Sequence, residues 1–296
     1  MNPTKKPEGG LTAPFFAPGW DLGRLVIEPP GRPLVMGVVN LTSDSFFPGS
    51  RTAECGPAVE FALEQVAAGA DLIDLGAESS RPGSQPVGET EEMDRLLPVL
   101  EALRTETQLP VTVDTVRSGT ASAALDAGAD AINDISAGTG DPRMIPLAAV
   151  RGCGLVLMHM QGIPRTMQDA PKYLDVVAEV TGWLTARCRL ALDAGVAPER
   201  LMVDPGIGFG KTLAHNLALL GNLDVVAGDR PLLLGASRKR FIAEISGADV
   251  EDRLPGSLAA LVCAWQGRAS VVRVHDVRES IQFLEVLKTV ATFDKP

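Results

Sequence analysis

Short apolar runs recur along the chain from residue 34 onward, and each run ends close to a polar residue. Their length and their Val, Ile and Leu content are typical of strands that are buried on both faces. The eight runs are LVMGVVN (34–40), LIDLGAE (72–78), PVTVDT (110–115), AINDIS (131–136), GLVLMH (154–159), LMVDPG (201–206), PLLLGAS (231–237) and SVVRVHD (270–276). We expect a buried strand at each of these positions.

Segments with helical character separate the runs. The predicted helices cover residues 58–70, 89–107, 118–129, 175–195, 254–267 and 277–293. Gly69 and Gly195 suit helix ends, and Pro98 should kink the second helix. Eight strands alternating with helices predict a (β/α)8 TIM barrel, a fold of about 250 residues. The rival is a doubly wound open sheet, which usually carries GxGxxG after its first strand, whereas NLTSDSFFPGS stands there in this chain.

The N-terminal segment, 1–33, is rich in Pro and Gly and holds one short apolar stretch at 25–27. We expect an irregular or hairpin cap, so the chain divides into an N-terminal cap (1–33) and a barrel (34–296). Lys5 and Lys6 are followed by Pro and Gly instead of an apolar run, which argues against a signal peptide. No stretch approaches the length of a membrane span. We therefore expect a cytoplasmic protein.

Composition narrows the possible partners. The chain of 296 residues is 45% hydrophobic and 22% charged, and its net charge is −10. This charge argues against broad binding to nucleic acid or to an anionic membrane, but a local basic cluster can still hold an anionic small molecule. The four cysteines, at 55, 153, 188 and 263, show no metal-binding spacing, so we interpret them as free thiols in a reducing compartment.

Polar residues stand at nearly every predicted strand end. In a TIM barrel these ends face one mouth, where the active site is built. A single Asp or Asn there is more often a helix cap, but a whole ring of polar residues favours a site. The set is Asn40, Glu78, Asp114, Asn133, His159, Asp204, Ser237, Arg273 and His275.

One part of this set accepts hydrogen bonds. Asp114 and Asp204 are carboxylates and Asn133 is an amide. Buried carboxylates need donors, and a planar heterocycle with adjacent ring N–H and amino groups, such as a pterin or guanine, supplies them in a bidentate way. A metal site is the alternative, but the HxxE or HExxH spacing of a transition-metal site is missing.

A second part is cationic or rich in donors. Arg273 and His275 lie two positions apart on one strand and therefore share a face. Together with Lys239, which follows the seventh strand, they suit phosphate oxygens. Arg238 and Arg240 are interpreted as a solvated helix start.

Two loops border the predicted mouth, at residues 41–51 and 79–84. Both mix Gly, Ser and Pro with a few charges, which suits mobile lids that exclude water from a reactive intermediate. A plain surface loop is the alternative, although Phe46 and Phe47 are unusual on one.

The segment DPGIGFGKT (204–212) ends like a phosphate-binding loop. A P-loop needs Gly five positions before its Gly-Lys-Thr, and that position holds Pro205. Asp204 at the strand end is therefore the more informative residue, and the glycines would let backbone approach a bound ring.

The ordered motifs resemble the dihydropteroate synthase family. They are VMGVVNLTSDSF, DLIDLGAESSRPG, VDT, IND, LMHMQGIPRTMQ, DPGIGFGKT, GASRKRF and RVHD, and they span about residues 34–290. Each motif alone is weak, but the ordered set is specific. The resemblance implies a pterin-binding barrel, usually a homodimer and a sulfonamide target. It implies condensation of 6-hydroxymethyl-7,8-dihydropterin pyrophosphate with p-aminobenzoate, with Mg²⁺ as the metal, to give 7,8-dihydropteroate and pyrophosphate.

The resemblance also assigns roles to residues. The pterin pocket maps onto Asp114, Asn133, Asp204 and Lys239. The pyrophosphate site maps onto Asn40, Arg273 and His275, with Asn40 also near Mg²⁺. The p-aminobenzoate site maps onto Phe46, Ser80, Arg81, Pro82, Phe209 and Lys211. The residues expected to be catalytic are Asp44, Arg81, Lys239, Arg273 and His275.

The chain departs from the family pattern at Ser43, 47–50, Ala77 and Ser80. Loop length is unchanged, so we still expect a working lid. Two rival functions remain open. One is a pterin-binding methyltransferase, against which the pyrophosphate set argues, and the other is a non-catalytic pterin-binding paralogue.

Overall fold

The computed structural model describes residues 19–41, 55–79 and 83–293. Several residues expected in the site belong to the loops outside these ranges. They are Asp44, Phe46, Ser80, Arg81 and Pro82.

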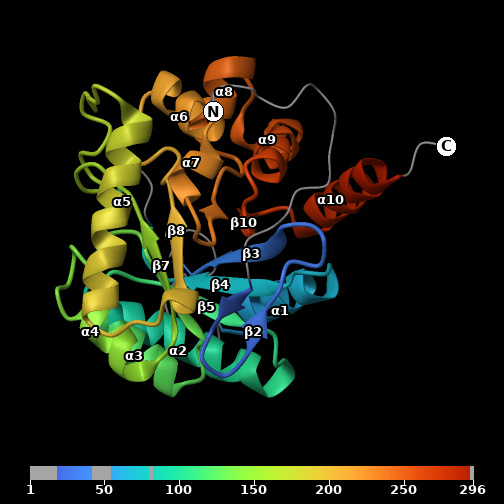
Figure 1. The fold of residues 1–296 in the computed structure, drawn as a ribbon. Coiled ribbons are helices and arrows are strands. Elements are labelled where there is room, and N and C mark those ends of the chain that lie inside the picture. Colours follow the sequence, from blue (N-terminus) through green and yellow to red (C-terminus); the bar gives the residue numbers. More distant parts are fainter. Residues whose placement is uncertain (1–18, 42–54, 80–82, 294–296) are drawn as a thin grey trace.

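Eight parallel strands form the centre of the molecule (Figure 1). They are β3 (Leu34–Asn40), β4 (Leu72–Gly76), β5 (Val111–Asp114), β6 (Ala131–Asp134), β7 (Gly154–Met158), β8 (Leu201–Asp204), β9 (Leu233–Leu234) and β10 (Val271–Val274). Each lies within a predicted run. The sheet order is β8-β7-β6-β5-β4-β3-β10-β9, and a parallel bridge between Val203 and Leu232 closes the ring. The predicted (β/α)8 barrel is therefore confirmed.

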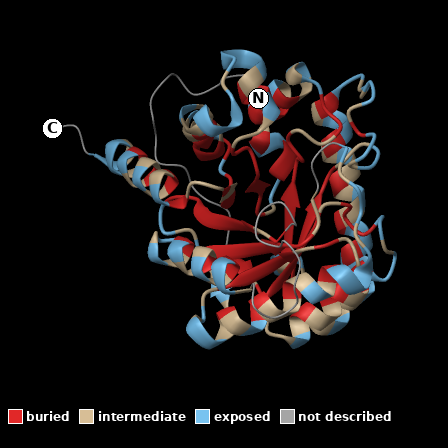
Figure 2. Ribbon diagram, turned by 180° about the vertical axis from the view of Figure 1, so that it is seen from behind, coloured by how far each residue is buried: buried red, intermediate tan, exposed pale blue. Residues whose placement is uncertain are grey.

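Helices surround the strands, and Figure 2 shows their exposed outer faces around the buried sheet. The predicted ones correspond to α1 (Cys55–Ala67), α2 (Glu89–Glu106), α3 (Ser118–Asp126), α5 (Val176–Asp193), α9 (Leu254–Gln266) and α10 (Val277–Thr292). Helix α2 continues through Pro98. The pattern missed α4 (Met144–Arg151), α6 (Leu213–Leu220), α7 (Leu223–Ala227) and α8 (Arg240–Ser246), which are too short to show a clear helical period. Two short 3-10 turns lie at Pro198–Arg200 and Val250–Asp252.

The strands bury side chains on both faces, as the continuous apolar runs require. Outward residues such as Val39 and Leu75 pack with the helices in one large cluster. Inward residues near the strand starts, among them Met36, Leu72 and Met202, form a second cluster inside the barrel. This apolar layer, called the floor from here on, fills the N-terminal half of the barrel. The polar strand ends lie above it.

A two-stranded hairpin, β1 (Trp20–Asp21) and β2 (Val26–Ile27), closes the barrel at the end opposite to the mouth. A hairpin was one of the two forms expected for this region. Trp20 is 1% exposed, and its indole N–H donates to the Arg200 carbonyl at 2.9 Å. Gly154 is the first residue of β7. A Cβ at this position would lie 2.9 Å from the Trp20 ring, so the close packing leaves no room for a side chain. The division into a 1–33 cap and a 34–296 barrel stays a prediction.

Two further expectations concern the cysteines and the membrane-spanning potential of the helices. All four cysteines are free; Cys153 and Cys188 are buried, and Cys55 and Cys263 are half-buried. Among the described helices, none combines the length and the apolar character that a membrane span requires.

Candidate functional site

A polar layer lies above the apolar floor, at the carboxyl ends of the strands. Asp114 on β5 pairs in register with Asn133 on β6, so the two side chains are neighbours. Asp74 on β4 pairs with Thr112 one step deeper. Asn133 and Asp204 are buried, 3% and 5% exposed. The strand register therefore brings the predicted acceptor set together at one end of the barrel.

Asp74 is the centre of this layer, although it was not among the predicted site residues. Its side chain is fully buried; Oδ2 accepts from Arg273 Nε at 2.6 Å and from Asn133 Nδ2 at 3.2 Å. Its Oδ1 accepts the hydroxyl of Thr112. The sequence held a signal, because a carboxylate in the middle of an apolar strand must find buried partners. Asp74 thus fixes the positions of an arginine and an amide that were both predicted in the site.

Arg273 joins the two predicted sets. Besides Asp74, its guanidinium donates from Nη2 to Asp114 Oδ2 at 3.1 Å. Burial raises the pKa of Asp114 to about 7; Arg273 opposes this rise and Asp74 adds to it. The cationic and acceptor groups that the sequence separated are therefore one connected network at the base of the mouth.

Asp204 ends β8 and turns toward the mouth. Its Oδ1 accepts the backbone N–H of Gly206 at 2.6 Å. Burial raises its pKa, and the nearby Lys239 ammonium is the main opposing influence. A Cβ on Gly235 would lie 4.0 Å from Asp204 Oδ2 and 3.7 Å from Lys239 Nζ. Because Gly235 has no side chain, it takes up no space beside these two groups.

Lys239 and Phe209 form a second wall of this space. The Lys239 ammonium donates to the Ile207 carbonyl at 2.5 Å and lies 4.6 Å from the centre of the Phe209 ring. A cation over an aromatic face is favourable. Burial lowers the pKa of Lys239 to about 8, while Asp204 opposes this effect. These two predicted residues are in contact.

His275 lies at the end of β10 against Ser237. The Nδ1 atom and the Ser237 hydroxyl are 3.1 Å apart, and the hydroxyl also accepts the His275 backbone N–H at 3.3 Å. Burial and, to a smaller extent, Arg273 lower the pKa of His275 to about 4, so the ring is neutral near pH 7. We assign the hydroxyl as the donor to Nδ1, which places the ring proton on Nε2 and leaves that atom as a donor.

Lys211 lies deeper than its predicted place near p-aminobenzoate suggests. It is 3% exposed, and its Nζ lies 3.0 Å from His159 Nδ1, 3.3 Å from the His159 carbonyl and 3.0 Å from the Phe209 carbonyl. These contacts engage the ammonium inside the protein. The neighbouring strand-end residue His159 is thereby explained as a buried partner of Lys211.

Arg238 and Arg240 stay outside this cluster. Arg238 pairs with Asp276, with 3.0 Å from its Nε to Oδ2. Arg240 is exposed and pairs with Glu244 one helical turn away. Arg240 agrees with the interpretation as a solvated helix start, whereas Arg238 precedes α8, is half-buried and is held by Asp276 and Ser257.

Asn40, the last residue of β3, is half-buried beside the mouth and pairs in register with Gly76. The described residues hold no group of three or more His, Cys, Asp or Glu that could bind a metal. Mg²⁺ commonly binds through one or two protein oxygens together with substrate phosphates and water. A single amide oxygen from Asn40 fits that pattern.

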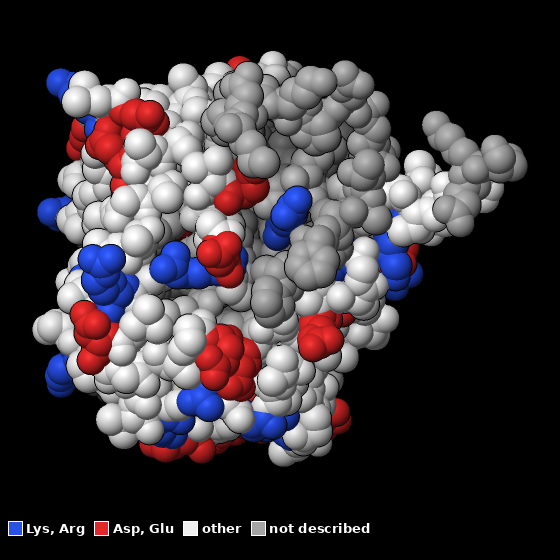
Figure 3. All heavy atoms as spheres, in the orientation of Figure 1, with Lys and Arg blue, Asp and Glu red and all other residues white. Residues whose placement is uncertain are grey.

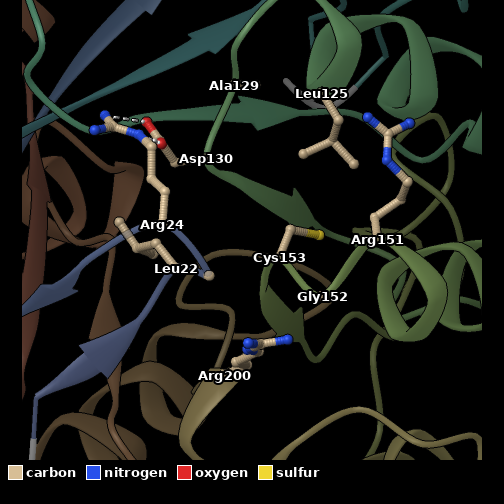
Figure 4. Close-up of a pocket in the computed structure, with 10 residues that line it drawn as sticks. Leu22, Arg24, Leu125, Ala129, Asp130, Arg151, Gly152, Cys153 and Arg200 are labelled. Carbon is tan, nitrogen blue, oxygen red and sulfur yellow. Dashed lines mark hydrogen bonds and ion pairs between the residues drawn. The ribbon is translucent and has the colours of Figure 1, made fainter.

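A separate hollow of about 350 Å³ lies at the hairpin end of the barrel (Figure 4). Arg24, Arg151 and Arg200 line it. Each pairs with a carboxylate: Arg24 with Asp130, which it shares with Arg104, Arg151 with Asp126 and Arg200 with Asp21. The Arg24 and Arg200 pairs hold the hairpin to the barrel, far from the mouth, and the Arg151 pair joins α4 to α3.

Acidic and basic side chains are intermixed on the described part of the face in Figure 3. The described part of this face has no broad basic surface.

Comparison with known proteins identifies the family. The family model described as "Pterin binding enzyme" matches residues 36–275. A dihydropteroate synthase of Synechocystis is 39% identical over 274 residues, which are 92% of this chain and 95% of the relative.

Comparison with solved structures points to the same family. Xanthomonas albilineans dihydropteroate synthase with 4-aminobenzoic acid superposes with a TM-score of 0.87 at 41% identity, covering 94% of this chain and 100% of that one. The same enzyme in complex with 7,8-dihydropteroate gives a TM-score of 0.83 at 39% identity, with the same coverage of both chains. The chain therefore belongs to the dihydropteroate synthase family of pterin-binding enzymes.

Proposed function

We propose that this protein works as a dihydropteroate synthase. It condenses 6-hydroxymethyl-7,8-dihydropterin pyrophosphate with p-aminobenzoate and forms 7,8-dihydropteroate and pyrophosphate. The observation that carries this assignment is the polar layer at the barrel mouth, where Asp114, Asn133 and Asp204 converge beside Lys239 and Arg273. A solved relative with bound 7,8-dihydropteroate supports the same product.

The acceptor groups bind the pterin ring. Asp204 is buried and only its Oδ1 has a backbone partner, so its second oxygen faces the space beside Gly235. The adjacent N–H and amino donors of a pterin satisfy such a carboxylate with two nearly parallel bonds. Asn133 and Asp114 complete the pocket from the neighbouring strands. A ring without these donors would leave acceptor positions of the buried carboxylates unfilled, which favours a pterin over such a ring.

Arg273, His275 and Asn40 bind the pyrophosphate. The Nε2–H of neutral His275 donates to a phosphate oxygen, since Ser237 occupies the other ring nitrogen. Arg273 adds a guanidinium that Asp74 and Asp114 hold in place. The Asn40 amide oxygen would help to hold Mg²⁺, which would supply positive charge beside the leaving group.

Phe209 and Lys239 border the place of p-aminobenzoate, and their contact keeps the aromatic face at a fixed distance from the pterin pocket. The family resemblance adds Phe46, Ser80, Arg81 and Pro82, with Asp44, from the two loops. We assign to these loops the closing of the mouth, which excludes water from the reacting carbon.

The reaction breaks the bond between the pterin methylene carbon and the pyrophosphate oxygen. Positive charge develops on the methylene and spreads into the ring, where the carboxylates of Asp114 and Asp204 stabilise it. The leaving oxygen takes the bonding electrons and faces the donors of Arg273 and His275. The aryl amine then bonds to the methylene carbon through its nitrogen lone pair and afterwards loses one proton to solvent or pyrophosphate.

We further propose a homodimer in the cytoplasm. Three large apolar side chains are exposed along α10 and at its end: Val286 at 59%, Val290 at 57% and Phe293 at 71%. Their spacing places them on one face. A second copy of the chain would cover this stripe.

Four free cysteines suit a reducing compartment.

A pyrophosphate-release assay separates this function from its rivals. Release should require the dihydropterin pyrophosphate, p-aminobenzoate and Mg²⁺ together. Pterin binding without release would favour the non-catalytic paralogue. Methyl transfer from methyltetrahydrofolate to a corrinoid, without pyrophosphate release, would favour the methyltransferase. Arg273 and His275 argue against methyl transfer, because a methyl donor without phosphates has no use for this pair.

A further inference from the structure

Lys211 and His159 form a buried pair that the proposed mechanism does not use. The ammonium of Lys211 lies 3.0 Å from His159 Nδ1 and is 3% exposed. Edge-on contact with Trp183, at 5.0 Å between ring centres, holds the imidazole. Burying a cation is costly unless its hydrogen bonds and charge are satisfied, so this pair needs an explanation.

The protonation states follow from the partners. Burial and, to a smaller extent, the neighbouring Lys211 lower the pKa of His159 to about 3, so the imidazole is neutral. Its Nδ1 then accepts and its proton lies on Nε2. Burial lowers the pKa of Lys211 to about 7, but Asp204 opposes this effect. The carbonyl oxygens of His159 and Phe209 accept from Nζ, and the ammonium form has a third N–H for the assigned acceptor Nδ1.

The ammonium ties the loop after β8, residues 205–210, to the end of β7. One bond goes to the Phe209 carbonyl in the loop and two go to His159. The loop lies directly on this neighbour, since a Cβ on Gly206, where φ is +66°, would stand 1.9 Å from the His159 carbonyl oxygen. Lys239 holds the same loop from the other side through Ile207.

This loop carries two groups of the proposed site. Asp204 precedes it and accepts from Gly206, and Phe209 lies near its end under Lys239. The charge of Lys211 also favours the ionised form of Asp204. One buried ammonium therefore acts on the shape of the loop and on the carboxylate that begins it.

We propose that Lys211 is a positioning residue: its buried ammonium, held by neutral His159 and the Phe209 carbonyl, fixes the 205–210 loop so that Asp204 and Phe209 meet their substrates, and it touches neither substrate. The proposal rests on the proposed function, and it replaces the expected contact between Lys211 and p-aminobenzoate.

The first experiment compares Lys211→Met with Lys288→Met. Lys288 is a matched control, since its ammonium donates to the Pro30 carbonyl at the remote end of the barrel. Lys211→Met should weaken the binding of 6-hydroxymethylpterin and raise KM for p-aminobenzoate, each by about tenfold or more, because small displacements of positioned groups are costly. Lys288→Met should leave both constants unchanged. Lys211→Met with both constants at wild-type values would overturn the proposal.

A second pair of variants separates positioning from general stability. In His159→Asn, the amide oxygen stands close to the place of Nδ1 and still accepts from Lys211, whereas His159→Leu removes the acceptor. We expect His159→Asn to keep both constants within about twofold of wild type and His159→Leu to resemble Lys211→Met. Equal losses in both His159 variants, in step with their melting temperatures, would assign the pair a merely structural role and contradict the proposal.

A third measurement tests for direct contact. If Lys211 bound the carboxylate of p-aminobenzoate, Lys211→Met would abolish the preference for p-aminobenzoate over the uncharged p-aminobenzamide and spare pterin affinity. We expect the preference to persist and pterin affinity to fall. Should the wild-type protein form no dihydropteroate, the proposed function fails, but the comparison of pterin affinities still decides the role of Lys211.

Discussion

Asp204→Asn tests whether a carboxylate at the end of β8 grips the pterin ring. The wild-type Oδ1 accepts the Gly206 N–H at 2.6 Å, and Oδ2 faces the space beside Gly235. An amide keeps one acceptor for Gly206 and places an NH₂ group where the second oxygen stood. The variant therefore preserves the loop and loses the bond to one pterin donor.

The magnitude follows from the bond that is lost. A hydrogen bond to a charged group contributes about 1.5–3 kcal/mol, which corresponds to a rise of roughly 10- to 150-fold in Kd. The upper part of this range is expected, since the new amino group faces a ligand donor and the Lys239 ammonium loses the main group that favours its charge.

Calorimetric titration with 6-hydroxymethylpterin, which lacks the phosphates, measures this effect without turnover. Asp193→Asn is the control, because Asp193 is exposed at the end of α5 and its substitution makes the same change of charge. Thermal unfolding of both variants shows whether the fold is kept. An Asp204→Asn protein that is folded and binds the pterin within about twofold of wild type would refute the reasoning.

Further predictions concern the buried Asp74, the pH dependence of pterin binding and the apolar end of the barrel. Asp74→Asn breaks the buried pair with Arg273, so it should lower the free energy of unfolding by about 3–5 kcal/mol in urea titrations; an equally stable variant would contradict the role of Asp74. Pterin affinity should rise with pH by up to about tenfold per unit below the pKa of Asp114 and level off above it, because the ligand binds the ionised carboxylate and binding releases a proton. That pKa is about 7, and calorimetry should find a shallower slope in Asp114→Asn than in wild type, because Asp204, whose pKa is also raised, is then the remaining carboxylate that binds the ring. Trp20 is buried at the end opposite to the mouth, so Trp20→Ala should cost about 3–5 kcal/mol of unfolding free energy in urea titrations and leave KM unchanged; a changed KM would contradict the separation of floor and site.

The barrel and most of the site could be predicted because strands in a parallel barrel are short, continuous and apolar. Once the strand ends are known, the period of two directs Asp114, Asn133 and Asp204 into the same mouth. The register pair between Asp114 and Asn133 bears this out.

Contacts between distant segments could not be predicted in the same way. Lys211 and His159 are 52 residues apart, and only the folded loop brings them together. Arg273 and Asp74 are 199 residues apart, so the pattern showed a cationic residue but not the carboxylate that holds it. The short helices α4 and α8 carry too few turns to reveal a period. The roles of Asp44 and Arg81 stay predictions, because both lie outside the described residues.

The most direct measurement of the central claim is product analysis with the purified protein. Incubation with 6-hydroxymethyl-7,8-dihydropterin pyrophosphate, p-aminobenzoate and Mg²⁺ should yield 7,8-dihydropteroate and pyrophosphate in equal amounts, as followed by chromatography with mass detection. Omission of either substrate should abolish both products. A protein that binds the pterin substrate but forms neither product would contradict the account.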